Sequence, residues 1–370
     1  MSERDAAAFE VWAPGRVNLI GEHTDYNDGL VLPMAIDRGL RLAVRRREDR
    51  LVVLRSERDS ATASLDIDRP LVPGAKGWTA YPAGVIAGFR ELGWDVPGFE
   101  ASVSGDLPAG AGLSSSAALE VATATAVETL CGRALPPHEK ALLCQRAEHA
   151  YAGVPCGIMD QFAVTLATAG HALLLDCRSL AVRHVPFRDG GVRVLVANSG
   201  VKHSLVDGEY AARRLQCEAA ARLLGVASLR DMTIEDPRCH GAGLPDVERR
   251  RAAHVVSENE RTLGFVAAVS AGDWPRAGRF MLESHASLAR DYDVSCRELD
   301  LLVEAAAALP GVHGCRMTGG GFGGCVVALV AADRADDVVT ALGRAYRAST
   351  GIDAMMFVTR ASDGVRVVPA

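Results

Sequence analysis

The chain has 370 residues, of which 49% are hydrophobic and 5% aromatic, and its formal net charge is −6. This length is enough for two domains with a cleft between them. The acidic balance and the scarcity of aromatic rings argue against binding to nucleic acid or to an anionic membrane, and the longest apolar run is far too short to cross a bilayer.

The cysteines and the N-terminus bear on the cellular compartment. Nine cysteines are scattered along the chain, without a C-x-x-C pair or a Cys/His spacing suited to zinc. An odd number of unclustered thiols is typical of a protein in a reducing compartment. The first five residues are mostly polar or charged and lack the apolar core of a signal peptide. We therefore expect a cytoplasmic protein with free thiols, and the sequence indicates no obligate protein partner.

Apolar segments bounded by turn residues predict strands in both halves of the chain. The predicted strands are Glu10 to Asn18, Leu40 to Arg46, Leu51 to Ser56, Phe99 to Ser104, Leu173 to Cys177, Val192 to Ala197 and Cys325 to Ala331. Helical periodicity, or a long run rich in alanine and leucine, predicts helices. These are Tyr81 to Leu92, Ser114 to Cys131, Pro137 to Ala150, Glu209 to Leu224, Asp246 to Leu263, Trp274 to Leu288, Cys296 to Leu309 and Ala335 to Thr350.

A polar, glycine-bearing segment from Pro186 to Gly191 is the candidate domain boundary. It divides the chain into an N-terminal domain, residues 1–188, and a C-terminal domain, residues 189–370. Because strands alternate with helices in both parts, the sequence predicts an α+β fold.

The most informative segment, Gly15 to Tyr26, reads GRVNLIGEHTDY. It crowds Arg, Asn, Glu, His, Asp and Tyr side chains around an aliphatic pair, Leu19 and Ile20, and it carries two glycines. A core strand would not carry so many polar groups, and a solvated loop would not need the aliphatic pair. The pattern predicts a short buried strand leading into a loop whose carboxylate, imidazole and guanidinium groups bind a small polyhydroxylated ligand such as a sugar.

A second motif, Gly110 to Ala118, reads GAGLSSSAA between a predicted strand and a predicted helix. Its glycines would let the backbone approach a phosphate, and the start of the helix would offer free N–H groups. No lysine follows the second glycine, so this is not a Walker A motif, and Mg²⁺ is the cation that we expect to offset the nucleotide charge. A plain glycine turn with a serine N-cap is the alternative interpretation.

Two carboxylates follow this loop, Glu148 near the end of a predicted helix and Asp160 in the segment CGIMDQF. Beside a phosphate loop, a carboxylate holds a metal ion or accepts a proton from the attacking hydroxyl. Arg16 is the natural partner of Asp160, since a guanidinium stays charged and can also stabilise charge on a moving phosphoryl group. The alternatives are a surface helix acid for Glu148 and a helix N-cap for Asp160.

A third glycine-rich segment, Arg316 to Cys325, precedes a predicted strand and has five glycines in six positions. So many glycines permit close packing of the backbone against a ligand or against another loop. A purely structural turn and a direct active-site role both remain open for this segment.

Together the three segments resemble motifs of the GHMP small-molecule kinases and, within them, of the galactokinases. Gly15 to Tyr26 is similar to the sugar signature, Pro108 to Ala118 to the phosphate motif, and Gly314 to Cys325 to the third motif. The resemblance extends over nearly the whole chain and is far more specific than any one motif.

This resemblance implies a two-domain GHMP-kinase fold with the active site in the cleft between the domains. It also implies transfer of the γ-phosphoryl group of ATP to O1 of α-D-galactose. Asp160 would face the C1 hydroxyl and Arg16 would lie beside the γ-phosphate, as the two catalytic residues. The resemblance assigns sugar binding to Glu22, His23, Thr24, Asp25, Gly157 and Tyr210.

For the nucleotide, the resemblance implies one group of residues around the phosphates and two near the base. The phosphates would be wrapped by Gly110, Ala111, Gly112, Leu113, Ser114, Ser115 and Ser116. Ser56 and Trp78 would lie near the base, and Ser116 and Glu148 would bind Mg²⁺. Two other functions stay open, a kinase of this fold that acts on another sugar such as N-acetylgalactosamine, and a galactose- and ATP-binding sensor without catalysis.

Overall fold

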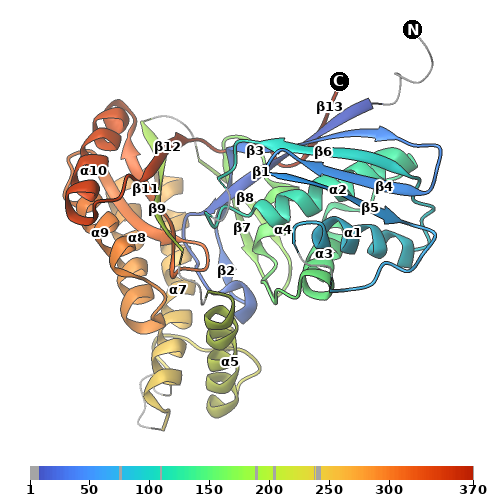
Figure 1. The fold of residues 1–370 in the computed structure, drawn as a ribbon. Helices are drawn as coiled ribbons and strands as arrows, with labels where there is room; N and C mark the ends of the chain where they lie inside the picture. The colour runs from blue at the N-terminus through green and yellow to red at the C-terminus, as the bar shows by residue number, and fades with distance from the viewer. Residues whose placement is uncertain are drawn as a thin grey trace.

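The structure is a computed structural model that describes residues 8–74, 77–108, 111–187, 191–202, 206–236, 238 and 243–369. Two sheets, each with its own helices, lie side by side (Figure 1). The predicted α+β class is confirmed.

The first sheet has six strands, and nearly all neighbours in it are antiparallel. In spatial order the strands are β13 (Arg366–Pro369), β1 (Ala8–Asn18), β3 (Pro33–Arg46), β6 (Phe99–Gly105), β4 (Leu51–Ser56) and β5 (Asp59–Asp66). The exception is the parallel pair of β4 and β6. Along β3 the outer half alternates between buried and exposed residues, which is the pattern of a strand with one face on the core.

Helices cover one face of this sheet (Figure 1). They are α1 (Ala80–Glu91), α2 (Ser115–Cys131), α3 (Pro137–Ala147) and α4 (Met159–Leu166), with a π-helical turn, Glu148–Ala152, directly after α3. The small side chains of α2 are buried all round, because this helix packs against both the sheet and its neighbouring helices. The packing of Ala117 to Glu128 therefore holds the start of this helix in place.

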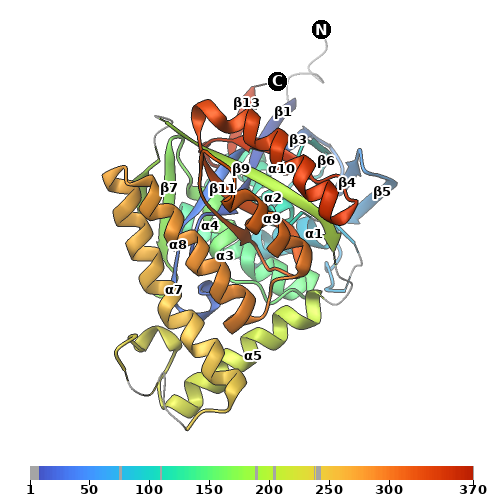
Figure 2. The same ribbon diagram turned by 90° about the vertical axis from the view of Figure 1, so that its left-hand side faces the viewer.

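The second sheet contains four antiparallel strands. They are β10 (Val312–Thr318), β11 (Gly323–Ala331), β9 (Val192–Lys202) and β12 (Met355–Thr359). The helices of this half are α5 (Val206–Leu224), α7 (Asp246–Ala271), α8 (Trp274–Ser287), α9 (Arg297–Ala307) and α10 (Ala335–Thr350). The helices α9 and α10 lie over the sheet when it is viewed from its outer side (Figure 2). In α10 the buried residues Val338, Leu342 and Tyr346 recur every fourth position, so that one stripe of the helix faces the core.

Short elements complete the description. A small sheet joins β2 (Leu30–Val31), β7 (His171–Asp176) and β8 (Val182–Pro186). Single helical turns are formed by Asp25–Asn27, Leu229–Asp231, Leu288–Tyr292 and Ala332–Arg334.

The predicted helices and strands are all present, with ends shifted by a few residues in most cases. The largest errors are at α7, which runs to Ala271, at β3, which begins at Pro33, and at β9, which runs to Lys202. The sequence analysis missed β2, β5, β8, β10, β12, β13 and the helix α4. Several of these are short or lie at sheet edges, where the apolar alternation is weak.

The proposed boundary near residue 188 follows β8 and precedes β9, at the passage from the first half to the second. One element crosses it. The C-terminal strand β13 pairs with β1 in the first sheet, with Val367 opposite Val11. A division at this point would therefore remove an edge strand from the N-terminal part.

Within the described residues, no helix has the length and apolar character needed to span a membrane. Each of the eight cysteines described is unpaired.

Candidate active site

The sugar signature leaves the first sheet at the end of β1. Leu19 and Ile20 are fully buried and anchor the segment in the core. The chain then turns sharply at Gly21, whose φ is +89° and where an added Cβ would lie 2.4 Å from the carbonyl oxygen of Leu30. Because only glycine fits this turn, the polar residues that follow are directed into a loop, as the sequence predicted.

Residues from the second half of the chain hold the loop after β1 in place by hydrogen bonds. The carboxylate of Glu258, on α7, accepts hydrogen bonds from the backbone N–H groups of Gly21 and Glu22. Glu22 in turn forms an ion pair with Arg316 at 2.7 Å, and both side chains are buried. Its other oxygen accepts the N–H of Gly319 at 3.0 Å. The third glycine-rich segment therefore contributes directly to the site.

Arg16 and Asp160 form the central ion pair of the site. The guanidinium donates two parallel hydrogen bonds to the carboxylate, each 2.7 Å long, and a third at 2.6 Å to the carbonyl oxygen of Gly112. Burial alone would lower the pKa of Arg16, but Asp160, Glu22 and other nearby carboxylates raise it above its ordinary value. Arg16 thus remains a fixed positive charge between the sugar signature and the phosphate loop.

Asp160 is the second residue of α4 and not its N-cap, which is Ile158. The hydroxyl of Ser114 donates a further hydrogen bond to its carboxylate. Ser114 adopts φ of +61° and does not cap α2 with its side chain. The first N–H groups of α2 are therefore left without a side-chain cap, which is the arrangement that favours a bound phosphate.

The first of two cavities, of about 520 Å³, opens beside the Arg16–Asp160 pair. Its lining includes Arg16, Glu22, His23, Asp25, Glu148, Gly157, Asp160, Tyr210, Gly319 and Gly320. Most predicted sugar residues, both predicted catalytic residues and the predicted metal ligand Glu148 thus share one cavity, to which segments from both halves contribute.

Burial changes the protonation of two groups in this cavity. It raises the pKa of Asp25 to about 7, with further contributions from the charges of Asp160 and Glu22. Burial also lowers the pKa of His23 well below its ordinary value, so the imidazole is neutral at pH 7. The ring nitrogen Nδ1 of His23 lies 2.8 Å from the hydroxyl of Tyr26, whereas Nε2 is buried without a hydrogen-bond partner.

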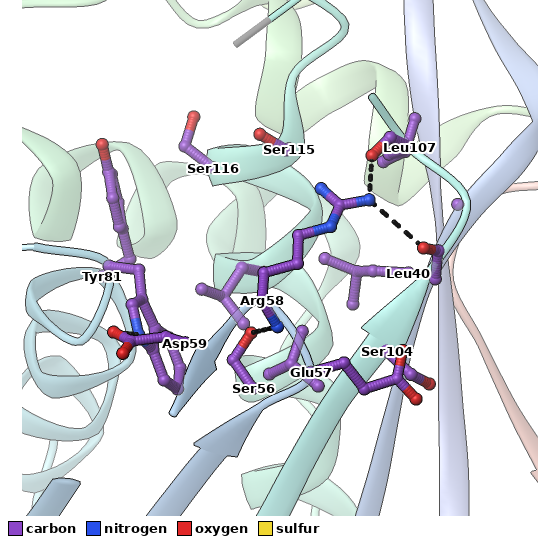
Figure 3. Close-up of a pocket in the computed structure, with 15 residues that line it drawn as sticks. Leu40, Ser56, Glu57, Arg58, Asp59, Tyr81, Ser104, Leu107, Ser115 and Ser116 are labelled. Atoms are coloured by element: carbon purple, nitrogen blue, oxygen red, sulfur yellow. Dashed lines mark hydrogen bonds between the residues drawn. The ribbon is translucent and has the colours of Figure 1, made fainter. Parts of the chain in front are cut away.

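A second cavity, of about 390 Å³, lies between the start of α2 and the β4–β5 hairpin (Figure 3). Ser115 and Ser116 line one end of it, and Ser56 and Trp78 are also part of its wall. Arg58 extends across the cavity toward Leu107, whose carbonyl oxygen it contacts (Figure 3). Both predicted base-side residues therefore belong to the same cavity as the phosphate loop.

The two cavities approach each other at the predicted metal ligands. Ser116 lines the second cavity and Glu148 lines the first, and a hydrogen bond from the Ser116 hydroxyl lowers the pKa of Glu148. Burial outweighs this effect and raises the pKa of Glu148 above its ordinary value. Glu148 is only 5% exposed, so it is not a surface acid.

Some predicted residues lie elsewhere. Thr24 is not part of the cavity lining, and its hydroxyl donates to the carbonyl oxygens of Gly21 and Leu30. Ala111 and Leu113 are buried, so only their backbone can face a ligand. Gly110 lies outside the described residues. The sequence analysis gave no role to Glu258, Arg316 or Gln161, although charged or amide side chains in otherwise apolar helices and strands are a usable signal.

Comparison with known proteins agrees with this geometry. Three family models match, "GHMP kinases N terminal domain" at residues 80–168, "Galactokinase galactose-binding signature" at residues 3–46 and "GHMP kinases C terminal" at residues 265–348. A galactokinase of Bos taurus is 48% identical over 366 residues, covering 97% of this chain and 92% of the relative. The chain belongs to the galactokinase family.

Solved structures support this membership. The crystal structure of Lactococcus lactis galactokinase complexed with galactose superimposes with a TM-score of 0.93 at 35% identity, covering 97% of this chain and 95% of that one. The mevalonate kinase of Methanococcus jannaschii has a TM-score of 0.67 at 18% identity, covering 96% and 98% of the two chains. The galactokinase family thus shares its fold with more distant kinases.

Proposed function

We propose that this chain transfers the γ-phosphoryl group of ATP to O1 of α-D-galactose, giving α-D-galactose 1-phosphate and ADP. Membership in the galactokinase family, together with the galactose-binding signature, makes the chain an ATP-dependent sugar kinase. The observation that carries the residue assignment is the Arg16–Asp160 pair, which stands between the sugar signature and the start of α2.

Asp160 is the residue that would act on the C1 hydroxyl. Arg16 and Ser114 donate to its two oxygens and hold the carboxylate in one orientation beside the cavity. Phosphoryl transfer depends mainly on alignment and on stabilisation of charge, so this fixed orientation is itself useful. Asp160 can accept the hydroxyl proton or, as an electrostatic anchor, orient that hydroxyl toward the phosphate.

Arg16 would stabilise charge on the transferring group. Its guanidinium donates to the carbonyl oxygen of Gly112 as well as to Asp160, which supports a place between the sugar and the phosphates. The uncapped N–H groups at the start of α2, next to Ser115 and Ser116, provide the remaining phosphate contacts.

The sugar would be held by groups with complementary roles. The carboxylate of Asp25 accepts hydrogen bonds from sugar hydroxyls when ionised. If the hydroxyl of Tyr26 donates to Nδ1 of His23, the unpartnered Nε2 carries the proton and donates to the sugar. The ring of Tyr210 packs 5.6 Å from that of His23 and closes one wall of the cavity.

The residues present fit a magnesium ion between Ser116 and Glu148. Burial raises the pKa of Glu148 and of Glu120, the nearby charge of Asp160 adds to both shifts, and Arg16 is the cation that pairs with Asp160. No group of three or more His, Cys, Asp or Glu side chains suited to a metal occurs in the described part of the chain. Mg²⁺ would therefore rely on Ser116, Glu148 and the nucleotide itself, and would neutralise charge on the phosphates.

We also propose a cytoplasmic location, because the cysteines described are unpaired, as expected in a reducing compartment.

An assay of ADP release with Mg-ATP and a panel of sugars tests the proposal. Galactose should be the best substrate by kcat/KM, and ³¹P NMR should show a phosphate on the anomeric oxygen. A higher kcat/KM with N-acetylgalactosamine would favour a kinase for another sugar. Binding of galactose and ATP without ADP release would favour a sensor.

A further inference from the structure

Glu120 is a buried acid for which neither the sugar nor the nucleotide provides a role. It lies on the second turn of α2 and is 0% exposed. Its Oε2 accepts a hydrogen bond of 3.0 Å from Nε2 of Gln161, and its Oε1 has no hydrogen-bond partner. Among the described residues it forms no ion pair, and a buried carboxyl without a cation is costly to a fold.

Gln161 connects Glu120 to the proposed metal ligand. Its Nε2 donates one hydrogen to Glu120 and the other to Oε2 of Glu148, at 2.7 Å. The amide presents its nitrogen to both acids, each of which has an oxygen that can accept from it. The oxygen of Gln161 is left buried without a partner, so this amide is oriented through its nitrogen, by the two carboxyl groups and by a longer contact of 3.9 Å with the thiol of Cys156.

As a consequence, the two carboxylate oxygens of Glu148 have different roles. Oε2 accepts from Gln161 and also from the thiol of Cys156, at 3.1 Å. Oε1 takes no part in these two hydrogen bonds, so it is the oxygen that can bind a cation shared with Ser116, whose hydroxyl also hydrogen-bonds to Glu148. If the amide of Gln161 turned over, its oxygen would face Glu148 and this arrangement would be lost.

We infer that Glu120 is a positioning residue that, through the amide of Gln161, fixes the carboxylate of Glu148 for the cation bound with the nucleotide. The inference rests on the proposed function, because it assumes that Glu148 binds that cation. Glu120 lines neither of the two cavities of the site. Partners that orient a metal ligand typically change metal affinity by about 10- to 100-fold when removed.

The test is the affinity of the protein for Mn²⁺ in the presence of ADP, measured by electron paramagnetic resonance, together with the Mg²⁺ dependence of turnover. Glu120→Leu and Gln161→Met each remove the connection and should weaken Mn²⁺ binding by about 10-fold or more. KM for galactose should change less than twofold. Glu120→Gln keeps an acceptor oxygen for Gln161 and should retain most of the affinity.

The double variant Glu120→Leu/Gln161→Met separates positioning from a general loss of packing. Because both changes break the same connection, it should bind Mn²⁺ about as weakly as Gln161→Met alone. The inference would be overturned if the losses of Mn²⁺ affinity in the two single variants multiplied in the double variant. A wild-type Mn²⁺ affinity in Glu120→Leu would overturn it as well. If Glu120→Leu does not fold, Gln161→Met and Glu120→Gln still decide, and equal losses in these two would contradict it.

A matched control is available on the same helix. Glu128 is also buried, but it pairs with Lys140 at 2.6 Å, away from the site. Glu128→Gln should lower the melting temperature without changing Mn²⁺ affinity. The Mn²⁺ titration tests the inference separately from the proposed function. A protein that phosphorylates no sugar would refute the proposed function, but its affinity for Mn²⁺ with ADP would still report on Glu120. A wild-type protein that binds no Mn²⁺ with ADP would refute the inference alone.

Discussion

The carboxylate of Asp25 lies directly over the α-carbon of Gly157: a Cβ built on this glycine would be 1.7 Å from Oδ2 of Asp25. The two residues come from different motifs, the sugar signature and the segment that leads into α4. The backbone at Gly157 does not require glycine by its φ angle, so the constraint is the space taken by the carboxylate.

Gly157→Ala should therefore displace Asp25 and weaken sugar binding. We expect KM for galactose to rise about tenfold or more, a loss of the order of one hydrogen bond to a charged group, while KM for ATP stays near the wild-type value. Steady-state kinetics with each substrate varied in turn measure both. Gly343→Ala, on α10 with open space around its α-carbon, is the control and should leave both constants unchanged. A rise in KM for ATP alone would place Gly157 outside the sugar site.

Asp160→Asn should abolish most of the turnover while galactose binding persists. The amide can no longer accept from Arg16 and Ser114 at both positions, and general-base assistance is worth about 10²- to 10⁴-fold. Isothermal titration with galactose and a single-turnover assay with ATP separate the two effects. Ser114→Ala removes one hydrogen bond but keeps the Arg16 pair, so its loss should be much smaller. Normal turnover in Asp160→Asn would remove this residue from the mechanism.

The binding of galactose should depend on the protonation of Asp25. Its pKa is raised to about 7, so the carboxylate is charged above this pH and protonated below it. Affinity should therefore fall between pH 8 and pH 6, by at most about tenfold per pH unit below 7. Calorimetric titration of galactose at several pH values, without nucleotide, measures this. Asp25→Asn should bind weakly with no such slope, and a flat profile in the wild type would argue against a role for the charge.

The same shift has the opposite sign for the stability of the unliganded protein. Because the fold favours protonated Asp25, its contribution is fully present below the ordinary pKa of 3.8 and is lost as the pH rises through about 7. Asp25→Asn should thus melt at a higher temperature than the wild type at pH 8 but not at pH 4. Calorimetry at the two pH values is the measurement. An equal change in melting temperature at both pH values would mean that burial of the charged carboxylate does not destabilise the fold.

Arg58 should contribute to nucleotide affinity. Among the described residues that line the second cavity it is the one cation, and its guanidinium lies toward Ser115 and Leu107 (Figure 3). Arg58→Gln should raise KM for ATP several-fold, since an exposed charge is worth about 1 kcal/mol or less. ATP and ADP should lose more affinity than adenosine, because the guanidinium acts on phosphates. Arg55→Gln, an exposed neighbour that does not line the cavity, is the control. Equal losses for adenosine and ATP would assign Arg58 to the base or the ribose instead.

Local sequence patterns predicted much of the fold and the site. The alanine-rich run of α2 and the apolar run of β11 have few alternatives as local structure, and both were predicted nearly to the residue. The glycine and serine pattern before α2 predicted a helix start with free N–H groups, and the structure has such a start, because these groups follow from the backbone alone. The pairing of Arg16 with Asp160 followed from chemical complementarity.

Other parts of the site depend on contacts between distant segments. Nothing local to Glu258 indicates that its carboxylate holds the backbone of Gly21, since this contact joins α7 to the loop after β1. For the same reason the sequence assigned Thr24 to the sugar, whereas its hydroxyl is used within the loop. The C-terminal strand β13 is short and lies at a sheet edge, so its pairing with β1 left no pattern to detect.

The ion pair of Glu22 and Arg316 joins positions 294 residues apart. During synthesis, the sugar loop must leave the ribosome long before Arg316 exists to neutralise Glu22. The nascent N-terminal part therefore carries an uncompensated acid at a position that is buried in the finished protein. Galactose recognition can arise only near the end of translation, and a chain released early would have a phosphate loop but no complete place for the sugar.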